Sequence, residues 1–226
     1  MTKRLRKVAK KVRAPRRGLF ITFEGPEGSG KTTHSRLLCS FLKKIGWDIL
    51  HTREPGGTAI GEEIRKVLLD PKNKDMDVKS ELFLYMAARA QILKEKIFPS
   101  LKRGKVVVCD RFMDATLAYQ CYGGALDIKS VSAIGNFVTG GITPDITFLL
   151  DIDPKKGFLR SGKVKDRMER KPLLFHRKVR RGYLAIAEKE PARVKVISSG
   201  GNVAETQEKI RRELLKSVKK IGLHGI

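Results

Sequence analysis

Cysteine is scarce in this sequence, and its spacing excludes one familiar kind of metal site. The 226 residues include three cysteines, at positions 39, 109 and 121, and no two of them form a C-x-x-C pair. We therefore expect Cys39, Cys109 and Cys121 to be buried free thiols rather than metal ligands. A reducing compartment fits this usage.

Long apolar runs are also missing. No apolar stretch approaches the roughly 18 residues that a membrane-spanning helix needs. The basic N-terminus has no secretory apolar region, because Glu24 interrupts the one apolar segment near it. We expect a soluble, cytoplasmic protein without a membrane partner. With 41% hydrophobic residues, the chain suffices for one α/β domain with a substantial core.

Acidic residues are few compared with basic ones. The chain has 24 Asp and Glu against 48 Lys and Arg, and residues 1–17 carry nine Lys or Arg and no acid. A net charge of +24 favours nonspecific attraction to nucleic acid and draws phosphorylated small molecules to a site. Residues 1–17 fit a nucleic-acid arm, a targeting segment or a disordered solubilising extension. We favour the extension, which leaves residues 18–226 as the folded domain, because transit peptides are usually richer in serine.

Three of the 21 glycines fall in one short segment with the spacing that phosphate binding uses. Residues 25–32 read GPEGSGKT, which matches the pattern G-x-x-x-x-G-K-[ST], with an apolar run before it and helical apolar spacing after it. Such a loop points successive backbone N–H groups into one concavity at a helix N-terminus, which attracts phosphate. A glycine-rich turn that binds nothing is the alternative, and the flanking strand and helix disfavour it. The predicted nucleotide-binding residues are Gly25, Pro26, Glu27, Gly28, Ser29, Gly30, Lys31 and Thr32.

Two side chains of this loop suit a nucleoside triphosphate and its metal. Lys31 would reach the β- and γ-phosphates of ATP, and the hydroxyl of Thr32 would bind Mg²⁺. Asp110 ends the apolar run 106–109, in the manner of the magnesium-directed carboxylate of phosphate-loop enzymes. The sequence thus predicts ATP as phosphoryl donor and Mg²⁺ as cofactor, held at Thr32 and Asp110.

Apolar runs rich in β-formers alternate with segments of helical spacing. The alternation predicts an α/β fold with a parallel sheet covered by helices on both faces. The expected strands are 19–23, 49–52, 106–109, 146–150 and 194–197. Helical spacing is clearest at 60–69, 78–101 and 203–218, besides the helix after the phosphate loop.

Residues 153–171 lose apolar periodicity and are dense in Lys and Arg. In a phosphate-handling enzyme, a basic, poorly packed insertion is a candidate lid, because its closure would exclude water and bring cations to the transferring phosphoryl group. The alternative is a solvated charged hairpin, and spacing alone favours that alternative.

The phosphate loop alone does not separate kinases from GTPases or ATP-driven machines. A GTPase is disfavoured, because Asn73 and Lys74 are followed at once by Asp75, so the guanine-reading N-K-x-D spacing is missed by one residue. An adenylate kinase is disfavoured as well, because its loop normally continues Gly-Lys-Gly where this chain has Gly-Lys-Thr.

Four further segments narrow the choice of kinase. They are residues 52–58 (TREPGGT), 85–89, 110–112 (DRF) and 118–120. Their order and their places at strand ends closely resemble the thymidylate kinase family, and the resemblance runs from about Gly18 to the last helix. It implies phosphoryl transfer from ATP to dTMP, giving dTDP and ADP, by a Mg²⁺-dependent enzyme. It further implies a doubly wound five-stranded P-loop kinase fold with a short lid, and a homodimer.

The resemblance assigns acceptor roles to two arginines and one helix. Arg53 and Arg111 would bind the phosphate of dTMP, because a guanidinium fork fixes orientation as well as charge. The alternative for Arg53 is a surface residue that anchors a turn. Tyr85 takes the place of a stacking Phe, and Arg89, one helical turn later, would donate to O4 of thymine. Without the resemblance, an aromatic residue at this spacing is more often part of a core.

The remaining assignments concern the sugar, the base and the transferred group. By family analogy, Thr116 and Gln120 border the thymine, and Tyr119 crowds the 2′ position, which disfavours ribonucleotides. Glu27 matches an acidic position that contacts the 3′-hydroxyl of dTMP.

Gly28 stands where one branch of the family has an arginine, so the chain resembles the bacterial-type branch, in which the lid supplies the catalytic cation. Lys31 and Arg111 are the other predicted catalytic cations. In the lid, Arg160 and Arg167 are the candidates for this cation, and Lys163 is the next candidate.

Two other function classes stay open. A kinase for another nucleoside monophosphate or for a deoxynucleoside would keep Lys31 and Thr32 but prefer another acceptor, which a panel of acceptors would reveal. A nucleic-acid-binding ATPase or scaffold would show salt-sensitive binding that survives mutation of the acceptor site.

Overall fold

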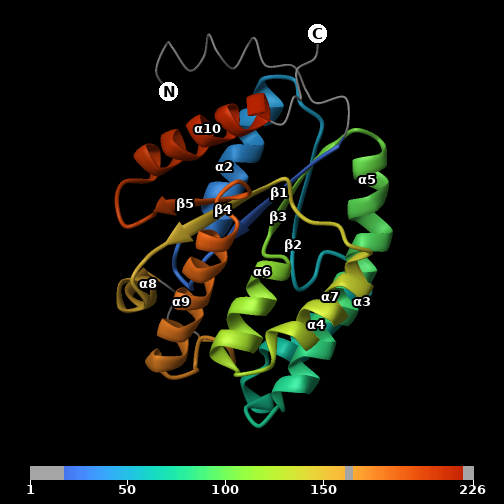
Figure 1. The fold of residues 1–226 in the computed structure, drawn as a ribbon, viewed down its shortest axis with the longest axis vertical. Coiled ribbons are helices and arrows are strands. Elements are labelled where there is room, and N and C mark those ends of the chain that lie inside the picture. The colour runs from blue at the N-terminus through green and yellow to red at the C-terminus, as the bar shows by residue number, and fades with distance from the viewer. Residues whose placement is uncertain (1–17, 161–164, 221–226) are drawn as a thin grey trace.

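The fold is built on a fully parallel sheet. The structure is a computed structural model that describes residues 18–160 and 165–220, so the predicted extension 1–17 and Lys163 lie outside the described residues. The five strands have the order β2-β3-β1-β4-β5 (Figure 1). They are β1 (Leu19–Glu24), β2 (Ile49–Arg53), β3 (Val106–Asp110), β4 (Ile146–Asp151) and β5 (Val194–Ser198). The prediction of a doubly wound five-stranded parallel sheet is confirmed.

Helices lie on both faces of this sheet (Figure 1). One face packs against α2 and α10, and the other packs against α4 with the turn that follows it and against α9. The helices are α2 (Lys31–Lys44), α3 (Ala59–Leu69), α4 (Val78–Ile92), α5 (Phe98–Lys102), α6 (Met113–Thr116), α7 (Ile128–Thr139), α8 (Pro154–Arg160), α9 (Leu173–Lys189) and α10 (Val203–Lys220). Short turns of other type are the 3-10 helix Pro71–Asn73 and the π-helices Leu93–Ile97 and Leu117–Gly123.

The central position of strand β1 explains why its sequence is almost entirely apolar. Leu19, Ile21 and Phe23 face the cluster that contains α2 and α10, while Phe20 faces the cluster on the opposite side. All six residues of β1 are buried, because a central parallel strand is covered on both faces. The apolar run before the phosphate loop is therefore the centre of the core.

Each strand extends one residue beyond its predicted end, and each added residue is polar. These residues are Glu24, Arg53, Asp110, Asp151 and Ser198. Backbone pairing continues through them although their side chains break the apolar pattern. The register pairs Phe23 with Asp110 and Asp110 with Arg53, so polar side chains of neighbouring strands meet at one edge of the sheet. Open α/β sheets bind their ligands at this carboxyl edge.

The first part of the predicted lid 153–171 is helical, whereas the sequence predicted an irregular segment. Residues 154–160 form α8 in place of a poorly packed loop, and α8 lies against the phosphate loop. A Cβ atom on Gly28 would come within 2.0 Å of the carbonyl oxygen of Gly157, so the two backbones approach as closely as glycine permits. A helix of seven residues is too short to show its period in the sequence.

The predicted helix 78–101 is a continuous helical run, with the π-helix Leu93–Ile97 joining α4 to α5. The three cysteines are buried free thiols, as expected. Within the described ranges, no helix is both long and apolar enough to cross a membrane.

Candidate active site

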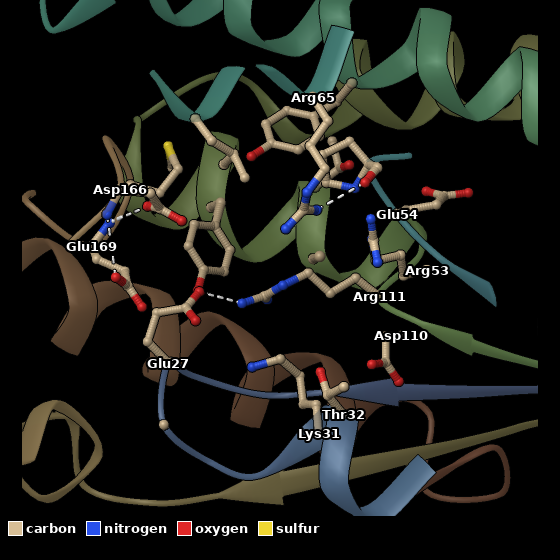
Figure 2. A pocket seen from close by; sticks show the side chains of 18 of the residues that line it. Glu27, Lys31, Thr32, Arg53, Glu54, Arg65, Asp110, Arg111, Asp166 and Glu169 are labelled. Atoms are coloured by element: carbon tan, nitrogen blue, oxygen red, sulfur yellow. Dashed lines mark hydrogen bonds and ion pairs between the residues drawn. The ribbon is translucent and has the colours of Figure 1, made fainter. Parts of the chain in front are cut away.

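A cavity of about 360 Å³ opens beside the carboxyl ends of β2 and β3 and the phosphate loop (Figure 2). This volume is in the range of pockets that hold small molecules. The predicted site residues that line it are Glu27, Gly28, Gly30, Lys31, Thr32, Arg53, Tyr85, Arg89, Asp110, Arg111, Thr116, Tyr119 and Gln120. Residues from five segments of the sequence thus meet in one place.

The phosphate loop presents an uncapped helix end to this cavity. Gly25, Gly28 and Gly30 have φ of 140°, 70° and 86°, which L side chains rarely adopt. α2 begins at Lys31 without a side-chain cap and without an acid in its first turn. Its first N–H groups and its dipole are therefore free to bind an anion, as phosphate-binding loops require.

Lys31 is held by the loop it belongs to. Its Nζ donates to the carbonyl oxygens of Gly25 at 3.0 Å and Pro26 at 2.8 Å. Burial, followed by the charge of Arg111, lowers the pKa of Lys31 to about 8, although nearby carboxylates oppose the shift. An incoming polyphosphate would offer this ammonium group stronger partners than two carbonyls and would raise its pKa again.

Thr32 and Asp110 fit a magnesium ion. Asp110 Oδ1 is buried and accepts no hydrogen bond, and His51 Nε2 lies 3.9 Å from it. A buried acceptor without a hydrogen bond suits a cation ligand. Burial would raise the pKa of Asp110, but the donor groups of His51, Ser35 and Thr32 around it hold the pKa below its ordinary value. Mg²⁺ usually combines one or two carboxylates with substrate phosphates and water. Among residues 18–160 and 165–220, no cluster of three His, Cys, Asp or Glu side chains forms a metal site by itself.

Arg111 occupies a backbone position that is unusual for a residue with a side chain. Its φ is 70°, in the left-handed region. Two hydrogen bonds hold this turn: Arg111 N donates to the carbonyl of Phe23 at 2.9 Å, and Phe112 N donates to Glu24 Oε1 at 2.7 Å. The end of β1 therefore fixes the direction in which Arg111 leaves β3.

The guanidinium of Arg111 lies between the phosphate loop and Tyr119, which lines the cavity (Figure 2). Nη2 pairs with the carboxylate of Glu27 and donates to the hydroxyl of Tyr119 at 3.2 Å. Nη1 donates to the carbonyl of Gly25 at 3.3 Å and to the hydroxyl of Tyr183 at 3.0 Å. The carboxylates and hydroxyls around it raise the pKa of Arg111 well above its ordinary value despite burial. Arg111 is thus a fixed cation.

Glu27, an acid within a phosphate loop, is surrounded by cations and a hydrogen-bond donor that stabilise its negative charge. Burial alone would raise its pKa, but Arg111, Lys31 and a hydrogen bond from Tyr119 outweigh burial and lower the pKa to about 2. Glu27 therefore stays ionised and balances the positive charge of the phosphate loop.

Sequence reasoning missed Glu24 and Tyr183. Glu24 is fully buried, and its Oε2 accepts from the hydroxyl of Tyr183 at 3.0 Å. Burial and the nearby charge of Asp114 raise the pKa of Glu24 to about 8. An acid that ends a buried strand directly before the phosphate loop was the available signal for Glu24. No sequence signal indicated Tyr183, because it reaches the site from α9, which is far away in the sequence.

The end of the cavity away from the loop is formed by α4 and the segment after β3. Tyr85 and Arg89 both line it, as their helical spacing predicted. Arg89 is almost fully buried and donates to three partners: Glu54 Oε2 at 2.7 Å, Thr116 Oγ1 at 3.0 Å and the carbonyl of Phe112 at 3.0 Å. These bonds fix the plane of the guanidinium. Glu54, from the TREPGGT segment, is its unpredicted counter-ion.

Thr116, Tyr119 and Gln120 do not lie on one regular α-helix. α6 ends at Thr116, and the π-helix Leu117–Gly123 carries Tyr119 and Gln120. Such π-helical turns are frequent at functional sites. Here the two side chains point to different acids: the Tyr119 hydroxyl donates to Glu27 at 2.9 Å, and Gln120 Nε2 donates to Glu81 at 2.7 Å.

Arg53 and the unpredicted Arg65 line one side of the cavity (Figure 2). Arg53 is half-exposed and donates to both oxygens of Glu62 at 3.0 Å. Nη1 of Arg65, which lies on α3, donates a hydrogen bond to the carbonyl of Pro55 at 2.8 Å. Burial and the neighbouring Arg53 lower the pKa of Arg65. The helical spacing of residues 60–69 predicted α3, but it did not indicate that Arg65 lines the cavity.

The two lid arginines contact protein groups rather than the cavity. Arg160 donates to the carbonyls of Ser199 at 2.8 Å and Gly200 at 2.7 Å, and so joins α8 to the segment after β5. Arg167 is 3% exposed, pairs with Glu81 at 2.5 Å and donates to the carbonyl of Leu68 at 2.7 Å. Neither residue lines the cavity. The expectation that these cations act at the phosphates stays a prediction. In this structure protein carbonyls accept from Arg160, and Arg167 pairs with a buried acid while its Nη1 has no hydrogen-bond partner. The nearby segment instead contributes Asp166, Met168 and Glu169.

Comparison with known proteins gives one consistent result. The family model described as thymidylate kinase matches residues 23–210. A thymidylate kinase of Geobacillus sp. (strain WCH70) is 48% identical over 193 residues, 84% of this chain and 92% of the relative. One from Halothermothrix orenii is 52% identical over 177 residues, 76% of this chain and 85% of the relative. The crystal structure of thymidylate kinase from Ehrlichia chaffeensis matches with a TM-score of 0.73 and 36% identity, covering 87% of this chain and 98% of that one.

Proposed function

The chain belongs to the thymidylate kinase family, and we propose that it transfers the terminal phosphoryl group of ATP to dTMP, giving dTDP and ADP. The observation that carries this proposal is the position of Arg111. Its guanidinium contacts the phosphate loop through Glu27 and Gly25 and also lines the cavity that α4 closes. A donor phosphate on the loop and an acceptor phosphate in the cavity would therefore meet at one fixed cation.

The donor side uses the free end of α2. N–H groups of the loop and the helix dipole would bind the phosphates of ATP, and Lys31 would exchange its two carbonyl partners for phosphate oxygens. Thr32 and Asp110 would hold Mg²⁺. When bound, Mg²⁺ would supply positive charge that neutralises the charge developing during transfer.

The acceptor side orients a phosphate with arginines. Arg111 is fixed by four partners, and Arg53 and Arg65 add charge to the same cavity. Paired guanidinium groups restrain the rotation of a phosphate as well as its position. In-line phosphoryl transfer depends on that restraint, because the attacking oxygen must approach opposite the leaving group. The chain's task is thus positioning and charge neutralisation.

The sugar and the base would lie beyond Arg111. Glu27 would accept from the 3′-hydroxyl, and the ring of Tyr119, held between Glu27 and Arg111, would crowd a 2′-hydroxyl. Tyr85 would stack on the base, with Arg89, Thr116 and Gln120 around its edge.

The test is a direct product assay with Mg-ATP. With dTMP present, ADP and dTDP should form in equal amounts, and Lys31→Met should lose most of this activity while its melting temperature stays close to that of the parent protein. Formation of ADP without dTDP would show hydrolysis or another reaction and would contradict the proposal.

The homodimer and the cytoplasmic location stay predictions. Phe83 on α4 and Phe137 on α7 are 57% and 89% exposed, which supports an interface on this side of the molecule. Nucleic-acid contact through residues 1–17 is not favoured. Removal of these residues should leave dTMP turnover intact.

A further inference from the structure

Glu81 is a buried acid to which the reaction itself gives no task. It lies on α4 and is 2% exposed. Its Oε1 accepts from Gln120 Nε2 at 2.7 Å, and its Oε2 pairs with Arg167 Nη2 at 2.5 Å. The carboxylate therefore links the segment after α8 to a residue that lines the cavity.

Arg167 is held firmly in this arrangement. Its backbone N–H donates to the carbonyl of Leu69 at 3.0 Å, and its Nε donates to the carbonyl of Leu68 at 2.7 Å. The end of α3 thus fixes both the main chain and the side chain of Arg167. Its guanidinium is then directed at Glu81, where it compensates the buried charge.

This pair determines which way the amide of Gln120 faces. A carboxylate paired with a guanidinium only accepts hydrogen bonds, so the amide nitrogen of Gln120 must be the atom that faces Glu81. The carbonyl oxygen of Gln120 is then left to the cavity. Without Glu81, an amide can turn over and present either a donor or an acceptor.

The cavity consequently presents a donor next to an acceptor. Arg89 can only donate, and Gln120, with its nitrogen bound, can only accept. Among pyrimidines, thymine and uracil offer the complementary edge, with an acceptor at O4 and a donor at N3–H. Cytosine offers the reverse, with a donor at N4 and an acceptor at N3.

We propose that Glu81, held by Arg167, is a positioning residue that fixes the amide polarity of Gln120 and thereby selects a pyrimidine with N–H at position 3. This inference rests on the proposed function, since it concerns the acceptor of that reaction. It also gives Arg167 a role besides the catalytic one expected from the sequence.

The test compares dUMP with dCMP, whose N3 accepts a hydrogen bond where N3–H of dUMP donates one. In the parent protein, kcat/KM for dCMP should be about 10- to 100-fold lower than for dUMP, because the Gln120 oxygen and N3 of cytosine are both acceptors and stay unpaired. In Glu81→Gln this penalty should shrink at least about 5-fold, with most of the change in KM, because Gln120 is no longer fixed and its amide can turn over to donate to N3.

A matched control is available on the same helical run. Gln91 pairs with Glu95 on the solvent side, so Glu95→Gln makes the same chemical change outside the cavity. It should keep the parental penalty. A Glu81→Gln protein that folds and keeps the parental penalty would overturn the inference.

If Glu81→Gln does not fold, Arg167→Lys is measured in its place. It retains a positive charge but loses the bond from Nε, and it should also reduce the penalty. An Arg167→Lys protein with the parental penalty would again overturn the inference. Failure of the parent protein to prefer dTMP over dCMP would instead contradict the proposed function, so the two failures are distinct.

Discussion

The hydroxyl of Tyr183 makes a sharp test of how Arg111 is held. It accepts from Arg111 Nη1 and donates to Glu24 Oε2, each at 3.0 Å, and its ring is 2% exposed. Tyr183→Phe removes both bonds without changing the shape of the ring. Both partners are ionisable. Glu24 is fully buried, so water does not replace its bond, whereas Arg111 is 17% exposed and lines the cavity.

The size of the effect follows from these two bonds. At neutral pH Arg111 is charged, whereas Glu24, with its pKa raised to about 8, is largely protonated. The bond to Arg111 contributes about 1.5 to 3 kcal/mol and the bond to neutral Glu24 about 0.5 to 1.5 kcal/mol, so we expect unfolding to become easier by about 2 to 4 kcal/mol. Arg111 keeps Glu27, Tyr119 and Gly25. Its position should therefore loosen rather than be lost, and kcat/KM for dTMP should fall about tenfold.

Urea unfolding and steady-state kinetics measure the two effects separately. Tyr122→Phe is the matched control, because the ring of Tyr122 packs against Gly182 on the same helix as Tyr183, away from Arg111. The control should stay within about 0.5 kcal/mol of the parent protein. If Tyr183→Phe matches the control in both assays, the hydroxyl does not position Arg111 and the reasoning is wrong.

Three further predictions test other parts of the site. The pKa of Glu24 is raised from 4.5 to about 8 in the folded protein, so its contribution to stability is complete below pH 4.5 and is lost as the pH rises through about 8; Glu24→Gln should flatten this fall in urea unfolding measured across that range. Arg65→Met should raise KM for dTMP about tenfold and leave KM for ATP unchanged in steady-state kinetics, and equal shifts in both would contradict an acceptor role. Arg160→Ala should raise KM for ATP a few-fold, because Arg160 fixes α8 beside the phosphate loop; a loss in kcat of about 10³-fold would instead show that Arg160 reaches the transferring group.

Features encoded by local spacing could be predicted from the sequence. The apolar runs located all five strands, and glycine positions located the phosphate loop. Arg53, Asp110 and Arg111 follow directly on such runs, so parallel pairing brings them to one edge of the sheet. Tyr85 and Arg89 were placed together by helical spacing alone.

Features that depend on distant contacts could not be predicted. The left-handed backbone of Arg111 depends on Phe23 and Glu24, which belong to another strand. The sequence predicted Arg167 as a catalytic cation of the lid, because its segment of the sequence is dense in Lys and Arg and lacks apolar periodicity. Its burial depends on Leu68 and Glu81, which lie 99 and 86 residues away.

The central claim is that one cavity joins ATP to a thymine nucleotide, and a competition assay tests it most directly. The protein is given Mg-ATP with equal concentrations of dTMP, dCMP, dGMP and AMP, and each diphosphate is quantified at early times. dTDP should exceed every other product by a large factor, which equals the ratio of the kcat/KM values. Comparable amounts of dCDP and dTDP would contradict the account.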